Sequence, residues 1–242
     1  MEWAGGLPGT IGGAVRGNAG AFGGETKDRI VAVMSLHVLS AQFSRASASS
    51  PRASALKLVR RTNEECRFGY RNSIFKEHDG EEIVVEAVFE LTKGDPVEIK
   101  RIADERINYR TTRHPIEFPN IGSMFKNIPL SQIYAEGTQE YAESIHSGLV
   151  SILRGSASNP RSSAFPVKHD PFPVIPTACL LAEAGLKGMT HGGAMISPKH
   201  PNFIVNVNHA TSADVKSLIA LVKKTIHEKF GVILEEEVIY VG

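Results

Sequence analysis

The chain has 242 residues, and its 27 lysines and arginines nearly balance its 26 aspartates and glutamates, so the formal net charge is +1. This length suits one large domain or two small ones, and the balanced charge gives no overall attraction to nucleic acid or anionic lipid. No apolar run approaches the roughly 18 residues that a membrane-spanning helix needs. Cys66 and Cys179 lie far apart without CxxC spacing. This is typical of reduced thiols in a cytoplasmic protein, although a pairing of the two stays open. We expect a cytoplasmic globular protein with neither nucleic acid nor a membrane among its partners.

The first 25 residues, MEWAGGLPGTIGGAVRGNAGAFGGE, contain nine glycines interleaved with apolar side chains. Glycine lets bare backbone approach a ligand closely, and successive N–H groups can converge on an anion. The apolar residues, among them Trp3 and Phe22, distinguish this stretch from a flexible linker. The segment therefore predicts an ordered loop that faces a phosphate or a cofactor. A Rossmann fingerprint is not expected at GTIGG, because no strand precedes it and further glycines, instead of a helix, follow.

Two strands and one helix are expected after this segment. Ile30–Leu39 and Ile83–Leu91 are rich in β-branched residues, which favour strands, whereas residues 40–55 are Ser-rich and indicate an exposed loop. The helix should begin at Pro96 with Asp95 as N-cap and Glu98 in a capping box, and end near Arg110. Its expected inner face comprises Ile99, Ile102, Ala103 and Ile107.

The second half of the chain predicts a mixture of helices and strands. Helices are expected over Gln139–Arg154, from a Thr177 cap through Glu183, and from a Ser212 cap to Gly231. Apolar residues repeat at helical spacing in the last of these. Strands are expected at Phe203–Val207 and within Val232–Val241. Because the elements mix without a regular βαβ order, the predicted fold class is α+β with two domains, divided just before HPIEFPN at residue 114.

Two segments carry candidate chemistry when they are considered alone. Arg71 stands among aromatic residues in FGYRNSIFK, which suits either a carboxylate or phosphate partner or a packing role. Ser123 follows a glycine and precedes Lys126 and Asn127, which suits proton transfer or an ordinary structural turn. A serine-hydrolase elbow is absent from the sequence.

The acidic and histidine positions are less distinctive. On a strand, Glu235 and Glu237 would share one face and Glu236 the other, as in a solvated acidic edge. His191 and His200 flank GGAMISPK, where either a ligand contact or a surface role fits. No pair of histidines has metal-ligand spacing, so no metal site is expected.

No single motif indicates a family, but the order of the motifs along the chain does. LPGTIGGAVRGNAGAFGGE, FGYRNSIFK, GSMFKN, AGLKGMTHGGAMISPKHPNFIVN and FGVILEEEV follow one another as in the UDP-N-acetylenolpyruvoylglucosamine reductase (UDP-N-acetylmuramate dehydrogenase) family, which the chain closely resembles over nearly its whole length. The resemblance implies an oxidoreductase with FAD and NADPH as cofactors. Its reaction would reduce the enolpyruvyl group of a UDP-sugar substrate to give UDP-N-acetylmuramate for peptidoglycan synthesis.

The resemblance also implies residue roles. Arg71 would neutralise charge on the substrate carboxylate, Ser123 would protonate the α-carbon as general acid, and Glu237 would help to polarise the intermediate. Implied substrate-binding residues are Tyr70, Arg113, Lys126, Asn127, Lys187 and His200. Implied cofactor-binding residues are Gly9, Gly12, Gly13, Asn18, Ala19, Gly20 and Gly23. Gly192 and Gly193 would shape the substrate side of the cleft.

One departure from the family concerns the start of the chain. Family members begin with a further domain that carries another glycine-rich flavin-binding segment, and Met1 here falls almost on the second such segment. The expected domains are therefore the second half of an FAD-binding domain, residues 1–112, and a substrate-binding domain, residues 113–242. Three hypotheses stay open: a truncated reductase, a non-catalytic UDP-sugar-binding fragment, and one subunit of a split flavoenzyme completed in trans by a separate flavin-binding piece. The long region 128–175 indicates a lid-like insertion, in which Tyr134 or Tyr141 is available as the lid residue.

Overall fold

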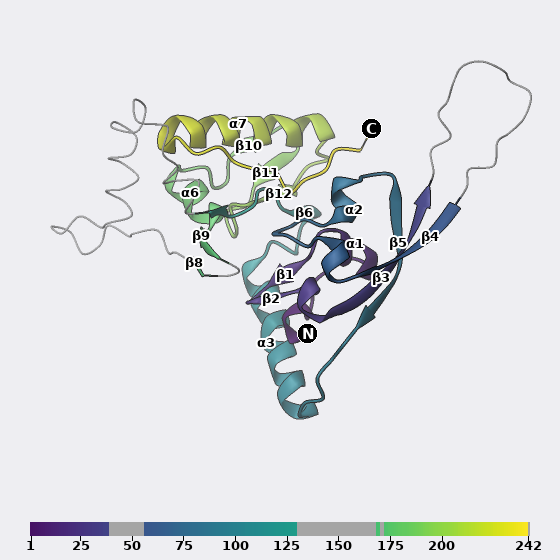
Figure 1. The fold of residues 1–242 in the computed structure, drawn as a ribbon. Helices are drawn as coiled ribbons and strands as arrows, with labels where there is room; N and C mark the ends of the chain where they lie inside the picture. The colour runs from purple at the N-terminus through teal and green to yellow at the C-terminus, as the bar shows by residue number, and fades with distance from the viewer. Residues whose placement is uncertain (39–55, 130–167, 170–171, 242) are drawn as a thin grey trace, which may run out of the picture. The chain divides into compact units, whose positions relative to one another are not determined.

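The structure is a computed structural model that describes residues 1–38, 56–129, 168–169 and 172–241. It consists of helices and several small antiparallel sheets (Figure 1), which confirms the predicted α+β class. By the contacts among its residues, the chain divides into two compact units, Met1–Asn108 and Tyr109–Gly242. The predicted loop at 40–55, the predicted helix Gln139–Arg154, and Tyr134 and Tyr141 lie outside the described residues. Among the described helices, none is both long enough and apolar enough to cross a membrane.

The glycine-rich segment folds into several short elements. They are η1 (Glu2–Ala4), α1 (Ile11–Arg16), β1 (Gly20–Ala21), β2 (Gly24–Glu25) and η2 (Thr26–Arg29). The expectation that no helix follows Gly9 was wrong, because Thr10 caps α1 by accepting a hydrogen bond from the Gly13 N–H at 3.1 Å. The helix is only six residues long and a 3-10 helix, not a strand, precedes it, so the argument against a Rossmann fingerprint still holds.

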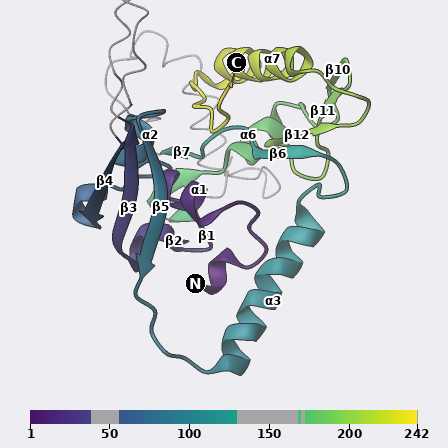
Figure 2. The ribbon, with the colours of Figure 1, turned by 90° about the vertical axis from the view of Figure 1, so that its right-hand side faces the viewer.

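A three-stranded antiparallel sheet forms the centre of the first unit. Figure 2 shows β3 (Ile30–Val38) between β4 (Leu56–Thr62) and β5 (Glu82–Phe89). The two predicted strands are confirmed as β3 and β5, and β4 was not expected. The short elements η3 (Glu64–Cys66) and α2 (Ile74–Glu77) follow β4. The buried core cluster of this unit consists of Val15, Ile30, Val33, Cys66 and Phe75.

Helix α3 (Pro96–Arg113) confirms the predicted helix and extends it by three residues. Asp95 accepts a hydrogen bond from the Val97 N–H at 3.0 Å, as a capping residue does. The predicted capping box was wrong, because the Glu98 carboxylate instead binds Arg101 one turn further on. The expected inner face is only partly buried, since Ile99 is 38% exposed and Ile107 is 40% exposed.

Two antiparallel sheets and two helices form the described part of the second unit. One sheet has the order β10-β11-β12-β6, and the other has the order β7-β9-β8. Their bounds are β6 (Asn120–Ser123), β7 (Ile128–Pro129), β8 (Lys168–His169), β9 (Pro173–Ile175), β10 (Thr190–His191), β11 (Ala194–Ile196) and β12 (Phe203–Asn206). The helices are α6 (Thr177–Glu183) and α7 (Ser212–Phe230), both expected from the sequence. Leu180, Leu218 and Ile226 belong to one large buried cluster.

Three details of this unit differ from the sequence-based expectations. The N-cap of α7 is Thr211, not Ser212, and its hydroxyl accepts from the Asp214 N–H. Thr177 does not cap α6, because its hydroxyl donates to the Lys126 carbonyl instead. The predicted strand within Val232–Val241 is reduced to one bridge, which pairs Glu236 with Phe125. Gly231 ends α7 in the left-handed conformation, as expected.

Candidate functional site

Arg71 lies at the tip of a tight turn in the first unit. Gly69 and Asn72 exchange both backbone hydrogen bonds, at 3.0 and 3.2 Å, so Tyr70 and Arg71 occupy the two central positions. Arg71 has a φ of 54°, a left-handed conformation that is costly for a residue with a side chain. Its guanidinium carbon lies 5.0 Å from the centroid of the Tyr70 ring. This contact stacks the cation on an aromatic face, as the sequence suggested.

The same arginine reaches the glycine-rich segment. Arg71 Nη2 donates to the Gly20 carbonyl at 2.8 Å. A Cβ on Gly20 would lie 2.9 Å from the Gly24 carbonyl oxygen and 3.3 Å from Arg71 Nη1, so this position has no room for a side chain. The structure thus brings the predicted catalytic arginine onto the predicted cofactor loop.

The other predicted cofactor residues differ in their surroundings. Gly12 and Gly13 lie in α1, the Ala19 carbonyl accepts from Thr26, and Gly23 takes the left-handed conformation at a φ of 82°. Gly9 has a φ of 130°, and a Cβ there would meet no atom within 4 Å. The Asn18 side chain is fully buried and bonds inside the protein, so any contact it makes with a cofactor would come from its backbone.

Glu25 is a candidate site residue that sequence reasoning missed. Its side chain is nearly fully buried, and Oε2 pairs with Lys27 Nζ at 2.7 Å, whereas Oε1 has no hydrogen-bond partner. A Cβ on Gly20 would lie 2.8 Å from Glu25 Cγ, so Glu25 and Arg71 border the same glycine. The glutamate closes the motif NAGAFGGE, which was the only signal for it in the sequence.

Ser123 and Glu237 are neighbours in the second unit. Ser123 ends β6 opposite Phe203 of β12, and the next residue, Met124, accepts a hydrogen bond from the Glu237 N–H at 2.8 Å. Asn202, which sequence reasoning missed, holds Phe125 by both its N–H and its carbonyl, at 3.1 and 2.8 Å. The Glu237 backbone therefore bonds to the residue that directly follows Ser123, although Ser123 and Glu237 lie 114 positions apart in the sequence.

The neighbouring acidic residues have separate partners. Glu235 binds Lys126 Nζ at 2.7 Å, and Glu236 binds Lys223 Nζ at 2.8 Å and the Tyr240 hydroxyl at 2.6 Å. The expectation of a solvated acidic edge therefore fits Glu235, whose side chain is 62% exposed, and was wrong for Glu236, whose side chain is 20% exposed and has two partners. Burial, together with the hydrogen bond to Glu236, raises the pKa of Tyr240 to about 12.

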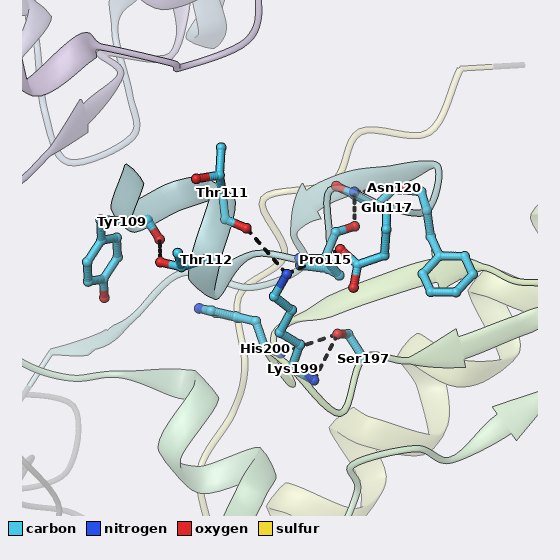
Figure 3. Close-up of polar contacts among 10 residues, drawn as sticks. Tyr109, Thr111, Thr112, Pro115, Glu117, Asn120, Ser197, Lys199 and His200 are labelled. Carbon is cyan, nitrogen blue, oxygen red and sulfur yellow. Dashed lines mark hydrogen bonds and ion pairs between the residues drawn. The ribbon is translucent and has the colours of Figure 1, made fainter. Parts of the chain in front are cut away.

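His200 lies in an aromatic cluster with His114 and Phe203. Its ring centroid is 5.4 Å from that of His114 and 4.7 Å from that of Phe203. Burial, and then the nearby His114, lowers the pKa of His200 to about 4, and its Nδ1 has no hydrogen-bond partner. Figure 3 shows Lys199, the residue before it, reaching toward Thr111 and Glu117, with distances of 3.4 and 3.2 Å. His114 was not foreseen, because the sequence around it indicated only a turn.

The remaining predicted substrate residues are spread over the second unit. Asn127 Oδ1 accepts from the Thr177 N–H at 3.3 Å, Arg113 lies over the Tyr109 ring, and Lys187 is exposed. Gly193 has a structural reason to be glycine, because a Cβ there would lie 2.1 Å from the Asn208 carbonyl oxygen. Within the described ranges, no group of three or more His, Cys, Asp or Glu residues could hold a metal ion.

Neither cysteine is a candidate nucleophile. Both are free, Cys66 is buried, and burial raises its pKa to about 11. Burial also raises the pKa of Cys179. A thiol that stays protonated is a poor nucleophile.

Comparisons with known proteins agree with the motif order. The family described as UDP-N-acetylenolpyruvoylglucosamine reductase, C-terminal domain, matches residues 114–241. Proteins named UDP-N-acetylenolpyruvoylglucosamine reductase from Exiguobacterium sibiricum and Limosilactobacillus reuteri are 35% and 36% identical over 242 residues, which is all of this chain and 59% and 60% of those relatives. The chain therefore spans about 60% of the length of the curated relatives it matches.

A solved structure agrees with the sequence matches. The crystal structure of the UDP-N-acetylenolpyruvylglucosamine reductase of Thermus caldophilus aligns with a TM-score of 0.60 and 28% identity, over 98% of this chain and 62% of that one. The family match covers more than half of the chain and includes the segments that carry Ser123 and Glu237. The chain belongs to the UDP-N-acetylenolpyruvoylglucosamine reductase family.

Proposed function

We propose that this chain carries the reaction and substrate residues of an FAD- and NADPH-dependent enzyme that reduces UDP-N-acetylglucosamine enolpyruvate to UDP-N-acetylmuramate, a peptidoglycan precursor, in the cytoplasm. The observation that carries the proposal is the similarity to reductases of this name along all 242 residues. The reaction adds a hydride to the β-carbon and a proton to the α-carbon of the enolpyruvyl double bond. The chain must therefore stabilise negative charge on the substrate and supply one proton.

The residues of the glycine-rich segment fit a bound FAD. The hairpin has no room for a Cβ at Gly20, whereas Gly9 is left-handed and open. One buried carboxylate oxygen of Glu25 has no hydrogen-bond partner. A ligand with hydroxyl and N–H donors would supply that partner. The proposed cofactor-holding residues are Gly9, Gly12, Gly13, Asn18, Ala19, Gly20 and Gly23. FAD, once reduced by NADPH, supplies the hydride.

Three side chains have proposed parts in the reaction. The permanently charged guanidinium of Arg71 stabilises the charge that develops on the substrate carboxylate, which is an electrostatic contribution. The Ser123 hydroxyl donates the proton to the α-carbon. Because a serine is a weak acid, it needs a polar neighbour, and the Glu237 segment lies next to it through the Met124 hydrogen bond. Glu237 is proposed to help polarise the intermediate.

The UDP-sugar would be held chiefly by residues of the second unit. The proposed contacts are Arg113, Lys126, Asn127, Lys187 and His200, with Tyr70 beside Arg71. His200 would act as a neutral hydrogen-bonding ring, because its pKa of about 4 keeps it uncharged near pH 7. The positive charges would come from Arg113, Lys126 and Lys187, which suits a diphosphate.

The direct test is NADPH oxidation that depends on UDP-N-acetylglucosamine enolpyruvate, measured after the purified chain has been mixed with FAD. Ser123→Ala is expected to lower turnover by about 10²-fold or more, and Arg71→Ala by a similar factor. Ser212→Ala is the matched control, because Ser212 is an exposed serine at the start of α7. Unchanged turnover in Ser123→Ala would remove the general-acid role.

A second candidate function remains beside the first. The chain would then be a non-catalytic UDP-sugar-binding fragment, or one subunit completed in trans by a separate flavin-binding piece. Titration with the UDP-sugar, combined with the NADPH assay, separates these alternatives from the first. Binding without NADPH oxidation supports the fragment. Oxidation that appears only when the N-terminal flavin-binding region of a full-length relative is added supports the split enzyme.

A further inference from the structure

Asn18 connects the glycine-rich segment to the turn that carries Arg71. Its side chain is 0% exposed, and its backbone is left-handed at a φ of 42°, a conformation that asparagine tolerates better than most residues. Oδ1 accepts from the Lys27 N–H at 3.0 Å, and Nδ2 donates to the Gly69 carbonyl at 2.9 Å. The amide places an acceptor and a donor on two separate atoms of one short side chain, so each bond uses its own end of Asn18.

Gly69 is the first residue of the Arg71 turn, so the Asn18 bond acts on the whole turn. Because Gly69 and Asn72 exchange both backbone hydrogen bonds, a displacement of the Gly69 carbonyl displaces Arg71. A left-handed arginine persists only where its surroundings hold it. The Arg71 guanidinium bonds back to Gly20, two residues beyond Asn18. The glycine-rich segment thus holds the turn at its base through Asn18 and at its tip through Gly20.

A third bond ties the same two segments together. Ser73, directly after the turn, is 0% exposed and donates through Oγ to the Arg16 carbonyl at 2.7 Å. We propose that Asn18 is a positioning residue that fixes the Arg71 turn against the glycine-rich segment, and so sets where the Arg71 cation meets the substrate. This role rests on the proposed function for its catalytic meaning, but the positioning itself is measurable without cofactor or substrate.

Asn63 offers a matched control in the same unit. Its Nδ2 donates to the Lys27 and Ile30 carbonyls at 2.7 and 2.8 Å, so it also makes two side-chain hydrogen bonds to the stretch that follows β2. Neither bond involves Gly69 or its turn. A general loosening of the unit would therefore follow from either substitution, whereas a specific loss of Arg71 positioning would follow only from a change at Asn18.

The test is the rate at which phenylglyoxal modifies Arg71 in the full chain, followed by mass spectrometry. Asn18→Gly removes the side chain while keeping a residue that accepts positive φ, and Asn18→Asp keeps the acceptor for Lys27 but loses the donor to Gly69. Both variants are expected to raise the Arg71 rate by about fivefold, the factor that corresponds to one lost hydrogen bond. Asn63→Ala should leave it within about twofold.

Arg61, which binds Glu82 at 2.6 Å in the same unit, is the internal reference. Its modification rate should stay unchanged in both Asn18 variants. An unchanged Arg71 rate, or an equal rise at Arg71 and Arg61, overturns the positioning role. Because no ligand is added, that outcome is independent of whether the chain turns over UDP-N-acetylglucosamine enolpyruvate, which the NADPH assay tests separately. If Asn18→Gly does not fold, the comparison of Asn18→Asp with Asn63→Ala decides.

Discussion

The left-handed backbone of Arg71 at the tip of the turn lowers the stability of the folded state. An L-residue in the left-handed region costs about 1–2 kcal/mol, and glycine, which avoids this cost, loses about 0.5–1 kcal/mol through its freer unfolded chain. We therefore expect Arg71→Gly to be more stable than Arg71→Ala by about 0.5–1 kcal/mol in urea unfolding, although both lose the bond to Gly20. At Lys57, a strand residue without positive φ, the order should reverse. If the backbone at Arg71 were unstrained, Arg71→Ala would be the more stable of the two variants, as at Lys57, and that order would contradict the prediction.

The lowered pKa of His200 should make the folded protein less stable in acid. Its folded pKa of about 4 lies below the usual value of 6.5, chiefly because of burial. The stability linked to neutral His200 is therefore complete above pH 6.5, and it is lost as the pH falls toward and through 4. We expect His200→Asn to reduce the loss of unfolding free energy between pH 6.5 and 4 by on the order of 1 kcal/mol. His209→Asn, at an exposed histidine, is the matched control for the substitution itself. Parallel curves for all three proteins would contradict this assignment.

Individual residues were predictable from the sequence to very different degrees. Arg71, Ser123 and Glu237 stand in distinctive motifs, so the order of those motifs nominated them before any geometry was known. Glu25 and His114 gained their character from burial, which depends on chain segments that are distant in the sequence. Sequence patterns record the residue type but not the desolvation that changes its chemistry.

The caps of α7 provide a prediction at the level of one element. Thr211 and Asp214 form a capping box, in which each side chain accepts from the other residue's backbone N–H. Thr211→Ala should therefore lower the free energy of unfolding by about 1 kcal/mol. Ser212→Ala, which the sequence would have named as the cap, should change it by less than about 0.5 kcal/mol. Chemical denaturation of the two variants decides which residue caps the helix, and a larger effect at Ser212 would contradict the structure.

Helices with a clear apolar repeat were predicted better than short strands. The periodic residues Leu218, Val222 and Ile226 all proved fully buried, so α7 was correct apart from its cap. The C-terminal Val232–Val241 segment has strand-forming residues but meets Phe125 in only one bridge. A strand is defined by its partner, and that partner lies more than 100 positions away. Local propensity therefore overestimated its regularity.

At the scale of the whole molecule, the two units differ in the size of their buried apolar clusters among the described residues. The second unit has one large cluster that includes Met124, Leu180 and Ile226, whereas the cluster of the first has five members. The sequence composition averages over both units and gave no sign of this contrast. The assignment of the units as flavin-binding and substrate-binding domains, with a boundary at residue 113, stays a prediction.

The sheet of the first unit leaves an apolar row on one face. Leu36 pairs with Leu58 on one side and Ile83 on the other, so the three side chains share that face. Leu58 is 60% exposed and Ile83 is 58% exposed, and β4, which carries Leu58, is an edge strand. Exposed apolar surface beside a sheet edge favours association between chains.

Leu58→Lys should therefore raise the monomer fraction at high protein concentration, measured by sedimentation velocity over a concentration series. The free energy of unfolding should change by less than about 0.5 kcal/mol, because the side chain is exposed. Ile233→Lys is the matched control, since Ile233 is 65% exposed and belongs to the second unit. A similar gain in both variants would attribute the effect to added charge alone. No gain in Leu58→Lys would mean that the apolar row does not drive association.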